Sequence, residues 1–220
     1  MKVAIFDFDG TLYSKETFQL LMDHLKQHPT HSSNYKRFFR NILPIYIGYK
    51  MKIVPETKMK ERSMQIYVNA LDTLSKTEFE CYFAELKDSM EQGFNEDVVA
   101  KVREHHNEGM HVMLVSGAYT PLLHAVTDSV VFDTVIGTDL PFTTDGAFDR
   151  KTEIYHIQGQ RKTEMIMEAL EGKKIDWEQS FAYGDSYSDL PVLELVGNPV
   201  AVKPEERLQR IAAERNWTVL

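Results

Sequence analysis

Two aspartates follow an apolar segment near the start of the chain, in the sequence IFDFDGTLYS. Asp7 and Asp9 are two residues apart, and residues two apart on a strand point to the same side, so both carboxylates are expected at the carboxyl end of one short buried strand. Neighbouring carboxylates repel each other, which raises the pKa of one of them unless a cation or a shared proton compensates. The pair therefore predicts a bound cation; a simple turn, with Asp9 capping it beside Gly10, is the alternative.

Two further aspartates follow a second strand-like segment. SFAYGD ends at Asp185, and Asp189 comes four residues later, at the start of an expected helix that Asp189 could also simply cap. Four carboxylates at one sheet edge, with no accompanying cysteine and no well-placed histidine, suit a hard divalent cation. Mg²⁺ is the expected cofactor, because it takes oxygen ligands and usually completes its shell with a substrate phosphate.

Groups suited to an anion follow another predicted strand. HVMLVS ends at Ser116, Gly117 comes next, and a helix with Pro121 in its first turn follows, so a hydroxyl, free backbone N–H groups and a helix dipole face one place. Lys162 opens the helix after IQGQRK, where a lysine is electrostatically unfavourable unless it serves a second charge. A phosphate group near Lys162 and Asp7 would supply that charge; a solvated helix residue is the alternative for Lys162.

Strands and helices alternate after Gly93, as the spacing of the apolar residues indicates. The predicted strands are 111–116, 133–140, 180–185 and 199–202, and the predicted helices are 96–109, 121–128, 161–172, 188–197 and 205–216. With residues 2–8 as the first strand, these repeated units predict an α/β fold with a mostly parallel sheet and helices on both faces. The carboxyl ends of such strands form the edge at which ligands bind.

The stretch between the first strand and Gly93 has no strand pattern. Amphipathic helical spacing occurs at 17–25, 62–71 and 76–90. Ser75 followed by Glu78 is the signature of a capping box, and the Asp-Gly pair in PFTTDGAFDR (141–150) predicts a hairpin. We therefore expect a core of residues 1–14 and 93–220 and an all-helical domain of residues 15–92 inserted after strand one.

The composition excludes several classes of function. The 220 residues are 43% hydrophobic and carry a formal net charge of −8, which argues against a nucleic-acid partner. No apolar stretch reaches the roughly 20 residues of a membrane span, and the N-terminal apolar run stops at Asp7, too early for a signal sequence. Cys81 is the one cysteine, so an internal disulfide is excluded. We expect a cytoplasmic monomer or homodimer with no nucleic-acid or membrane partner.

Four motifs together resemble those of the haloacid dehalogenase (HAD) superfamily, in the same order along the chain. They are DFDGT with Asp7, VSG with Ser116, Lys162, and GDSYSD with Asp185 and Asp189. The helical insertion is similar to the type-one cap of that superfamily, and residues 184–220 are similar to its phosphoserine-phosphatase-like subfamily. The resemblance covers essentially the whole chain and implies a HAD-like Rossmannoid catalytic core with a helical cap domain.

The resemblance also implies a function, namely a Mg²⁺-dependent phosphatase that hydrolyses a small phosphorylated metabolite through a phospho-aspartyl intermediate. Asp7 is then the nucleophile and Asp9 the general acid and base. The implied metal ligands are Asp7, the Asp9 backbone, Asp185 and Asp189. The implied substrate contacts are Asp7, Asp9, Gly10, Thr11, Glu16, Ser116, Gly117 and Lys162, of which Ser116 and Lys162 bind the transferring phosphoryl group.

The helical insertion should select the substrate. Glu16 stands where phosphoserine phosphatases have a glutamate that meets the substrate amine, and a surface residue is the alternative. Lys58, Lys60 and Arg62 are candidates for a substrate carboxylate or second phosphate, or they form a solvated helix face. The apolar run FFRNILPIYIGYKMKIV (38–54) is part of the core of the cap, or else an apolar substrate pocket or a dimer surface.

Departures from the family pattern leave the substrate unassigned. Phosphoserine phosphatases tend to have DFDST, SGGF and GDGAND where this chain has DFDGT, VSGAY and GDSYSD. A phosphotransferase or phosphomutase that uses the same aspartyl intermediate is the alternative function. A non-catalytic phospholigand-binding protein is disfavoured because no motif is broken, and a response-regulator receiver because its aspartate lies on a middle strand.

Overall fold

The chain folds into two compact units. The computed structural model describes residues 1–220. The core unit comprises Met1–Glu16, Phe83–Thr138 and Ile157–Leu220, and the insert unit comprises Thr17–Tyr82 and Asp139–His156. The division expected from the sequence differs from these units at residues 15–16, 83–92 and 139–156. No helix combines the length and the hydrophobicity that crossing a membrane requires.

A six-stranded sheet forms the centre of the core unit, in the order β3-β2-β1-β4-β5-β6. All five pairs of neighbouring strands run parallel. The strands are β1 (Val3–Phe6), β2 (His111–Tyr119), β3 (Thr134–Thr138), β4 (Phe181–Gly184), β5 (Asn198–Ala201) and β6 (Thr218–Val219). The predicted α/β fold with a mostly parallel sheet is confirmed. Strand β6 was not predicted, because two residues are too few to show a periodic pattern.

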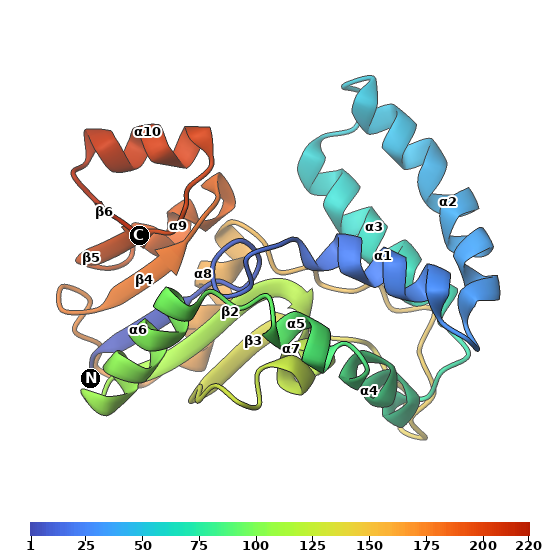
Figure 1. Ribbon diagram of the computed structural model, residues 1–220, viewed down its shortest axis with the longest axis horizontal. Coiled ribbons are helices and arrows are strands. Elements are labelled where there is room, and N and C mark those ends of the chain that lie inside the picture. The colour runs from blue at the N-terminus through green and yellow to red at the C-terminus, as the bar shows by residue number, and fades with distance from the viewer. The chain divides into compact units, whose positions relative to one another are not determined.

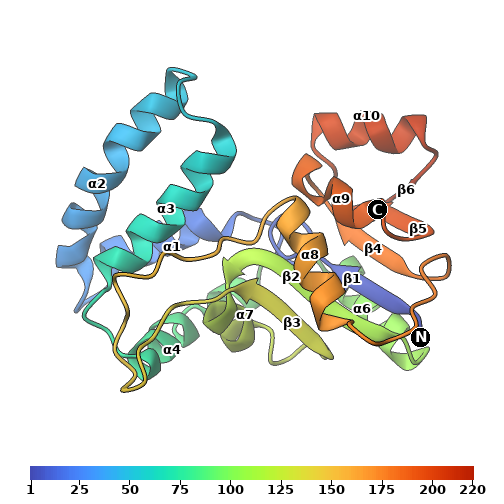
Figure 2. The same cartoon turned by 180° about the vertical axis from the view of Figure 1, so that it is seen from behind.

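Helices cover both faces of the sheet, as Figures 1 and 2 show from opposite sides. α6 (Glu96–Asn107) lies on one face, and α8 (Gln160–Ala169) lies on the other. The remaining helices of the core unit are α5 (Lys87–Glu91), α7 (Thr120–Val126), α9 (Leu190–Leu193) and α10 (Glu206–Glu214). The predicted helix 188–197 is instead a 3₁₀ turn, η1 (Tyr187–Asp189), followed by the short α9.

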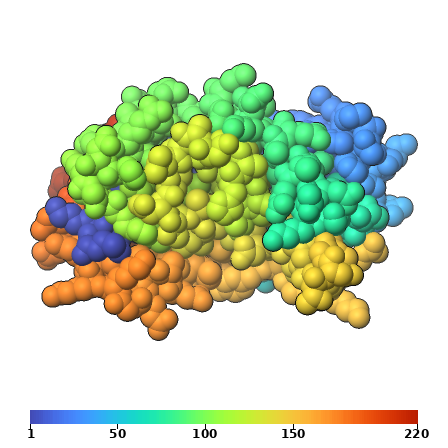
Figure 3. Space-filling view, turned by 90° about the horizontal axis from the view of Figure 1, so that it is seen from below, coloured from blue at the N-terminus to red at the C-terminus, as the bar shows by residue number.

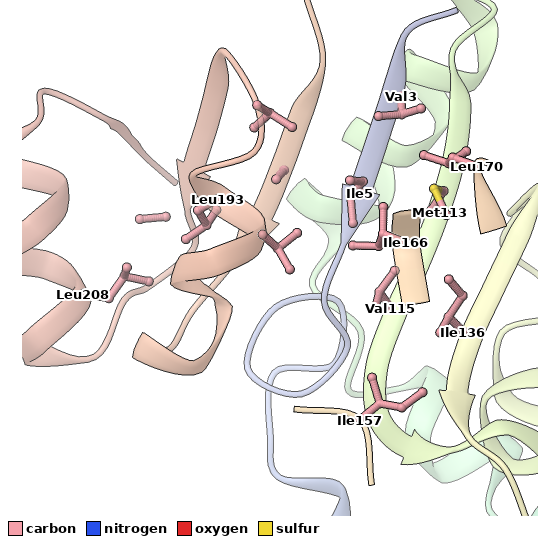
Figure 4. Close-up of a cluster of buried hydrophobic side chains, with 14 of the residues drawn as sticks. Val3, Ile5, Met113, Val115, Ile136, Ile157, Ile166, Leu170, Leu193 and Leu208 are labelled. Atoms are coloured by element: carbon pink, nitrogen blue, oxygen red, sulfur yellow. The ribbon is translucent and has the colours of Figure 1, made fainter. Parts of the chain in front are cut away.

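The face of the sheet under α8 carries a continuous apolar cluster (Figure 4). Val3 and Ile5 of β1 pack there with Met113 of β2, with Ile166 of α8 and with Leu170, which directly follows α8, all of them buried. Since side chains alternate along a strand, the next residue of this row after Val3 and Ile5 is position 7. The apolar pattern of β1 therefore directs an aspartate to the face of the sheet on which α8 lies.

Contacts between aromatic rings hold α6 against the opposite face of the sheet. The Phe6 ring stacks on Tyr183 of β4 with ring centroids 4.4 Å apart, and Nε2 of His105 in α6 lies 2.7 Å from the Tyr183 hydroxyl. At the amino end of the sheet, the Met1 ammonium donates a hydrogen bond to the Lys174 carbonyl at 2.8 Å. Figure 3 shows this neighbourhood, with the dark blue N-terminus beside orange residues of the C-terminal half. The ring contacts join α6 to β1 and β4, and the Met1 contact holds the start of the chain beside the segment that leads into β4.

The insert unit is helical, as predicted. Its helices are α1 (Thr17–Gln27), α2 (Ser32–Lys50), α3 (Glu56–Ala70) and most of α4 (Lys76–Ala84). The Tyr67 hydroxyl bonds to the Leu21 carbonyl at 2.9 Å and lies 2.7 Å from the Tyr82 hydroxyl, so the centre of the unit is partly polar. The predicted capping box is confirmed, since the Ser75 N–H donates to the Glu78 carboxylate at 2.7 Å. Helix α2 was not predicted separately, because its apolar residues lie on both its buried and its exposed side.

The predicted hairpin at 141–150 forms a turn with one antiparallel bridge, between Phe142 and Phe148. The Thr143 N–H donates to the Ala147 carbonyl at 2.9 Å to close the turn. The rings of Phe142 and Phe148 pack against Phe79 of α4, with centroids 5.8 and 5.6 Å from it. This packing explains why 139–156 belongs to the insert unit although the sequence places it between elements of the core.

Candidate active site

The predicted acidic and anion-binding residues lie at the carboxyl ends of three adjacent strands: Asp7 and Asp185 directly follow β1 and β4, and Ser116 and Gly117 lie within the last four residues of β2. β1 lies between β2 and β4, so these residues share one edge of the sheet. Asp7 directly follows β1 and is still held to β4, since its N–H donates to the Tyr183 carbonyl at 3.0 Å. Its side chain is buried, with 8% of the residue exposed. The carboxyl edge of the parallel sheet is thus lined by chemically active groups, as expected for an open α/β fold.

Lys162 joins two of the aspartates. It lies in the first turn of α8 and is 4% exposed. Its Nζ lies 2.5 Å from Asp7 Oδ1 and 2.6 Å from Asp189 Oδ1. The positive end of a helix disfavours a lysine in the first turn, and the two carboxylates compensate for it. A buried ammonium therefore bridges the residue after β1 to the turn after β4.

Asp189 is held on both of its side-chain oxygens. Its Oδ2 accepts hydrogen bonds from the Ser186 N–H at 3.1 Å and the Ser186 hydroxyl at 2.9 Å, while Oδ1 accepts from Lys162. The bonds to Ser186 form a capping box at the start of η1. Asp189 makes no side-chain cap bond to α9, the helix that the sequence suggested it could cap; it instead completes the capping box of Ser186, and it does so together with its contact to Lys162.

Two glycines allow the carboxylates to approach the backbone. Gly10 has a φ of +75°, and a Cβ there would lie 2.2 Å from Asp185 Oδ2. At Gly184 a Cβ would lie 2.6 Å from the Cβ of Asp189. A side chain at Gly10 would also be strained in the left-handed region. The glycines of DFDGT and GDSYSD thus leave the space in which Asp185 and Asp189 lie.

Three carboxylates are close enough to share one cation. A carboxylate oxygen from each of Asp7, Asp185 and Asp189 lies within 4.8 Å of the others. Asp9 is not part of this group, although we expected four converging carboxylates. Strand β1 ends at Phe6, and Asp9 forms an isolated bridge with Tyr13. The alternation of a regular strand therefore does not extend to Asp9, and its backbone carbonyl is the group that the resemblance assigns to the metal.

The electrostatics of the site show an excess of negative charge. Burial and the charge of Asp189 raise the pKa of Asp7 well above its usual range, against the opposing effect of Lys162. Burial, and next the charge of Asp189, raise the pKa of Asp185 to about 7, and Glu16 acts in the same direction. Burial favours a lower pKa for Lys162, but the carboxylates of Asp189 and Asp7 outweigh it and hold the pKa above the usual range. A hard divalent cation fits this set of oxygen donors, because it relieves the repulsion that one lysine leaves.

A bulge in β2 shapes the predicted anion-binding segment. The pairing register between β2 and β3 shifts between Val115 and Tyr119. Within the bulge, the buried Ser116 hydroxyl oxygen accepts a hydrogen bond from the Ala118 N–H at 3.1 Å. Gly117 is only partly buried. Bulges of this kind re-aim backbone and side-chain groups beside functional sites.

Thr138 supports that bulge and was missed in the sequence. Its hydroxyl donates to the Gly117 carbonyl at 2.8 Å and accepts from the Ile157 N–H at 3.2 Å, and the residue is fully buried. It thereby ties the segment with Ser116 to the segment that leads into α8 and Lys162. A hydroxyl residue at the end of a third parallel strand was the signal that could have indicated this role.

The two remaining predicted contacts differ in exposure. Thr11 is fully buried, and its Oγ1 has no hydrogen-bond partner in the structure. Glu16 is exposed, and its negative charge reaches Asp185. The structure therefore places Glu16 within electrostatic range of the acidic group, and the roles of both residues in substrate binding stay predictions.

Residues 4–194 match the haloacid dehalogenase-like hydrolase family. The chain belongs to that family. The predicted resemblance is thus confirmed, and the match spans every motif from DFDGT to GDSYSD.

The chain is also similar to known proteins in sequence and in structure. The chain is 32% identical over 135 residues to the "Inhibition of morphological differentiation protein" of Streptomyces azureus, covering 61% of this chain and 48% of that one. It is 31% identical over 117 residues to phosphoserine phosphatase SerB1 of Mycobacterium tuberculosis, covering 52% and 37%. A solved structure from Bordetella pertussis, of unknown function, has a TM-score of 0.82 at 22% identity, covering 100% of this chain and 97% of that one. The matches span less than half the length of both named relatives.

Proposed function

We propose that this HAD family member is a Mg²⁺-dependent phosphatase that hydrolyses a small phosphomonoester through a phospho-aspartyl intermediate on Asp7. The observation that carries the proposal is the buried contact of Lys162 with both Asp7 and Asp189 at the carboxyl edge of the sheet. A lysine held against a nucleophile is placed to neutralise the charge of a phosphoryl group that arrives there. The relative named phosphoserine phosphatase supports a phosphomonoester as substrate.

In the first step, a carboxylate oxygen of Asp7 attacks phosphorus in line with the leaving alcohol. A new P–O bond to Asp7 forms as the bond between phosphorus and the alcohol oxygen breaks, and Asp9 gives its proton to that oxygen. In the second step, Asp9 removes a proton from water, and the water oxygen attacks phosphorus. The bond between phosphorus and Asp7 breaks, which releases inorganic phosphate, restores the Asp7 carboxylate and leaves Asp9 protonated for the next cycle.

Other residues of the site bind and orient the phosphoryl group. Lys162 and the Ser116 hydroxyl would contact its oxygens, and the bulge around Gly117 would offer backbone N–H groups. The metal would be held by the Asp7 side chain, the Asp9 backbone carbonyl and Asp185, with Asp189 orienting Lys162 beside them. When bound, Mg²⁺ supplies positive charge that neutralises the carboxylates and the phosphate oxygens.

The alcohol part of the substrate would be selected by other residues than those that bind the phosphoryl group. Glu16, at the end of the first segment of the core unit, is the candidate contact for a substrate amine, since its charge reaches Asp185. The loop sequence GDSYSD differs from the phosphoserine phosphatase pattern, so the proposal names a phosphomonoester without choosing phosphoserine.

The decisive experiment compares Asp7→Asn with the wild-type protein in hydrolysis of p-nitrophenyl phosphate, with and without Mg²⁺. Loss of the nucleophile should lower the rate by more than about a thousandfold. Asp97→Asn, an exposed aspartate in the first turn of α6, is the matched control and should retain activity. Acid-quenched wild-type protein should carry phosphate on Asp7, as mass spectrometry of peptides can show. Robust turnover by Asp7→Asn contradicts the proposal, and transfer to an added alcohol in place of phosphate release indicates a phosphotransferase.

A further inference from the structure

The outer side of helix α2 exposes large apolar side chains. Phe39, Leu43, Tyr46 and Ile47 recur at spacings of three and four residues, so they share one side of the helix. Each is between 39 and 49% exposed. A neighbouring side of the helix carries Phe38 and Ile42, which are buried within the insert unit. The exposed residues therefore do not belong to the hydrophobic core of this unit.

The turn after α2 adds two more exposed apolar residues, Met51 at 65% and Ile53 at 71%. This turn is hydrogen-bonded: the Ile53 N–H donates to the Gly48 carbonyl at 2.9 Å, and Lys52 adopts a left-handed φ of +59°. Val54 packs so closely on Gly48 that a Cβ there would lie 2.8 Å from the valine side chain. Met51 and Ile53 are thus held outward by an ordered turn. We call the exposed apolar set the α2 stripe: Phe39, Leu43, Tyr46, Ile47, Met51 and Ile53.

Basic residues accompany the stripe, and acidic ones are absent. Residues 31–55 contain five lysines and arginines and no aspartate or glutamate, although the whole chain has a net charge of −8. Arg37 is engaged by Asp72 at 2.7 Å, but the other four, Lys36, Arg40, Lys50 and Lys52, are exposed and take part in none of the ion pairs of the structure. The Lys50 ammonium lies 5.3 Å from the centre of the Tyr46 ring, so cationic and apolar groups intermingle on one surface.

We propose that the α2 stripe docks on the surface of an anionic phospholipid bilayer. The surface of an anionic bilayer offers a partner for each kind of group in this region. The acyl chains can contact the apolar side chains, and the lipid phosphates can contact the four cations. Lysine and arginine side chains can bury their alkyl parts while their charged ends reach the headgroups. The sequence argued against a membrane partner because no segment can span a bilayer, and a helix that lies in the interface needs no span.

A second copy of the chain fits this surface less well. In a two-fold symmetric interface the same patch faces itself, so the four unpaired cations of one copy would approach those of the other. Burying like charges without partners costs free energy that the apolar contacts would have to offset. Charge complementarity therefore favours the lipid surface over self-association.

Co-flotation of the full chain with lipid vesicles tests the proposal, and it needs no enzymatic activity. Vesicles of equal parts phosphatidylcholine and phosphatidylglycerol should bind the protein, pure phosphatidylcholine should not, and high salt should release it. Replacing Lys36, Arg40, Lys50 and Lys52 by glutamine should weaken binding by about fivefold for each charge removed. The triple variant Phe39→Ser, Ile47→Ser, Ile53→Ser should also lose binding.

Matched controls change the same residue types elsewhere. Val131→Ser with Met167→Ser removes exposed apolar groups of the core unit, and Lys173→Gln with Lys174→Gln removes exposed charges there. All variants should keep the wild-type circular dichroism spectrum and unfolding midpoint. The proposal is overturned by equal binding to both vesicle types, by no vesicle binding, or by controls that weaken binding as much as the stripe variants. It is also overturned if sedimentation shows a lipid-free dimer that the stripe variants dissociate.

Discussion

The Lys162 ammonium lies 2.5 Å from Asp7 Oδ1, although the two residues are 155 positions apart in the chain and both are buried. The same ammonium lies 2.6 Å from Asp189 Oδ1. One cation thus faces three close carboxylates, of Asp7, Asp185 and Asp189. The balance of these charges governs both the stability of the site and its proposed chemistry.

Replacing Lys162 by methionine should destabilise the metal-free protein and abolish phosphatase activity. Removing one partner of a buried charge network leaves the other charges uncompensated, which costs about 3–5 kcal/mol of unfolding free energy. Urea denaturation at neutral pH measures this cost. Lys173→Met, an exposed lysine, is the control and should change the unfolding free energy by less than about 0.5 kcal/mol. A similarly small change for Lys162→Met would show that the contacts with Asp7 and Asp189 contribute little.

Mg²⁺ should raise the unfolding midpoint of the wild-type protein, because a ligand that binds only the folded state stabilises it. Asp185→Asn should remove this stabilisation. Without metal, the same variant should be at least as stable as wild type, because it removes a carboxylate whose pKa burial and Asp189 raise to about 7. Differential scanning fluorimetry with Mg²⁺ and with EDTA measures both effects, with Asp97→Asn as control. A full Mg²⁺ shift in Asp185→Asn would exclude that residue as a ligand.

Thr138→Val should slow the reaction more than it weakens substrate binding. The hydroxyl holds the Gly117 carbonyl and the Ile157 N–H, so its loss should misplace Ser116 and Lys162 and lower kcat about ten- to a hundredfold. Thr138→Ser keeps the hydroxyl and should restore kcat.

Thr127→Val is the matched control for this buried hydroxyl. Thr127 donates to the Leu123 carbonyl at 2.8 Å within the same unit but away from the motifs. Both valine variants should lose about 1–3 kcal/mol of stability, and Thr138→Val alone should lose activity. Equal activity of the two variants would show that Thr138 has only a structural role.

His105 should make the folded state sensitive to mild acid. Burial lowers the pKa of His105 below its usual 6.5, against the pull of Glu108 and Glu104. The unfolded chain therefore takes up a proton first, so the contribution of His105 to stability is complete above pH 6.5 and decreases as the pH falls below it. The slope should approach but not exceed about 1.4 kcal/mol per pH unit.

The difference between wild type and His105→Phe isolates this effect from the carboxylates. Phenylalanine can occupy the aromatic environment of Phe6, Phe181 and Tyr183 but cannot take up a proton. Unfolding free energies measured between pH 5 and 7.5 should show the slope in wild type and in the exposed control His106→Gln, and lose that component in His105→Phe. An unchanged slope in His105→Phe would assign the acid sensitivity to other groups.

Much of the candidate site was predictable because its residues stand at the ends of strands with continuous apolar patterns. The positions of Asp7, Ser116 and Asp185 follow from where those patterns stop. The same pattern does not place Asp9, because β1 ends at Phe6 and regular strand alternation does not extend as far as residue 9. Thr138 was missed because its role depends on two backbone partners 21 and 19 residues away, which no local pattern encodes.

By itself, the sequence determined the α/β fold, the order of the motifs and the residue types at the sheet edge, since these depend on local periodicity and on side-chain chemistry. Only the tertiary structure decided that Lys162 bridges Asp7 and Asp189, that the segment 139–156 packs with the inserted helices, and which side of α2 is exposed. The physical reason is that these relationships depend on contacts between residues distant in the chain. Such contacts are fixed when the apolar faces of strands and helices pack together, and local sequence does not specify them.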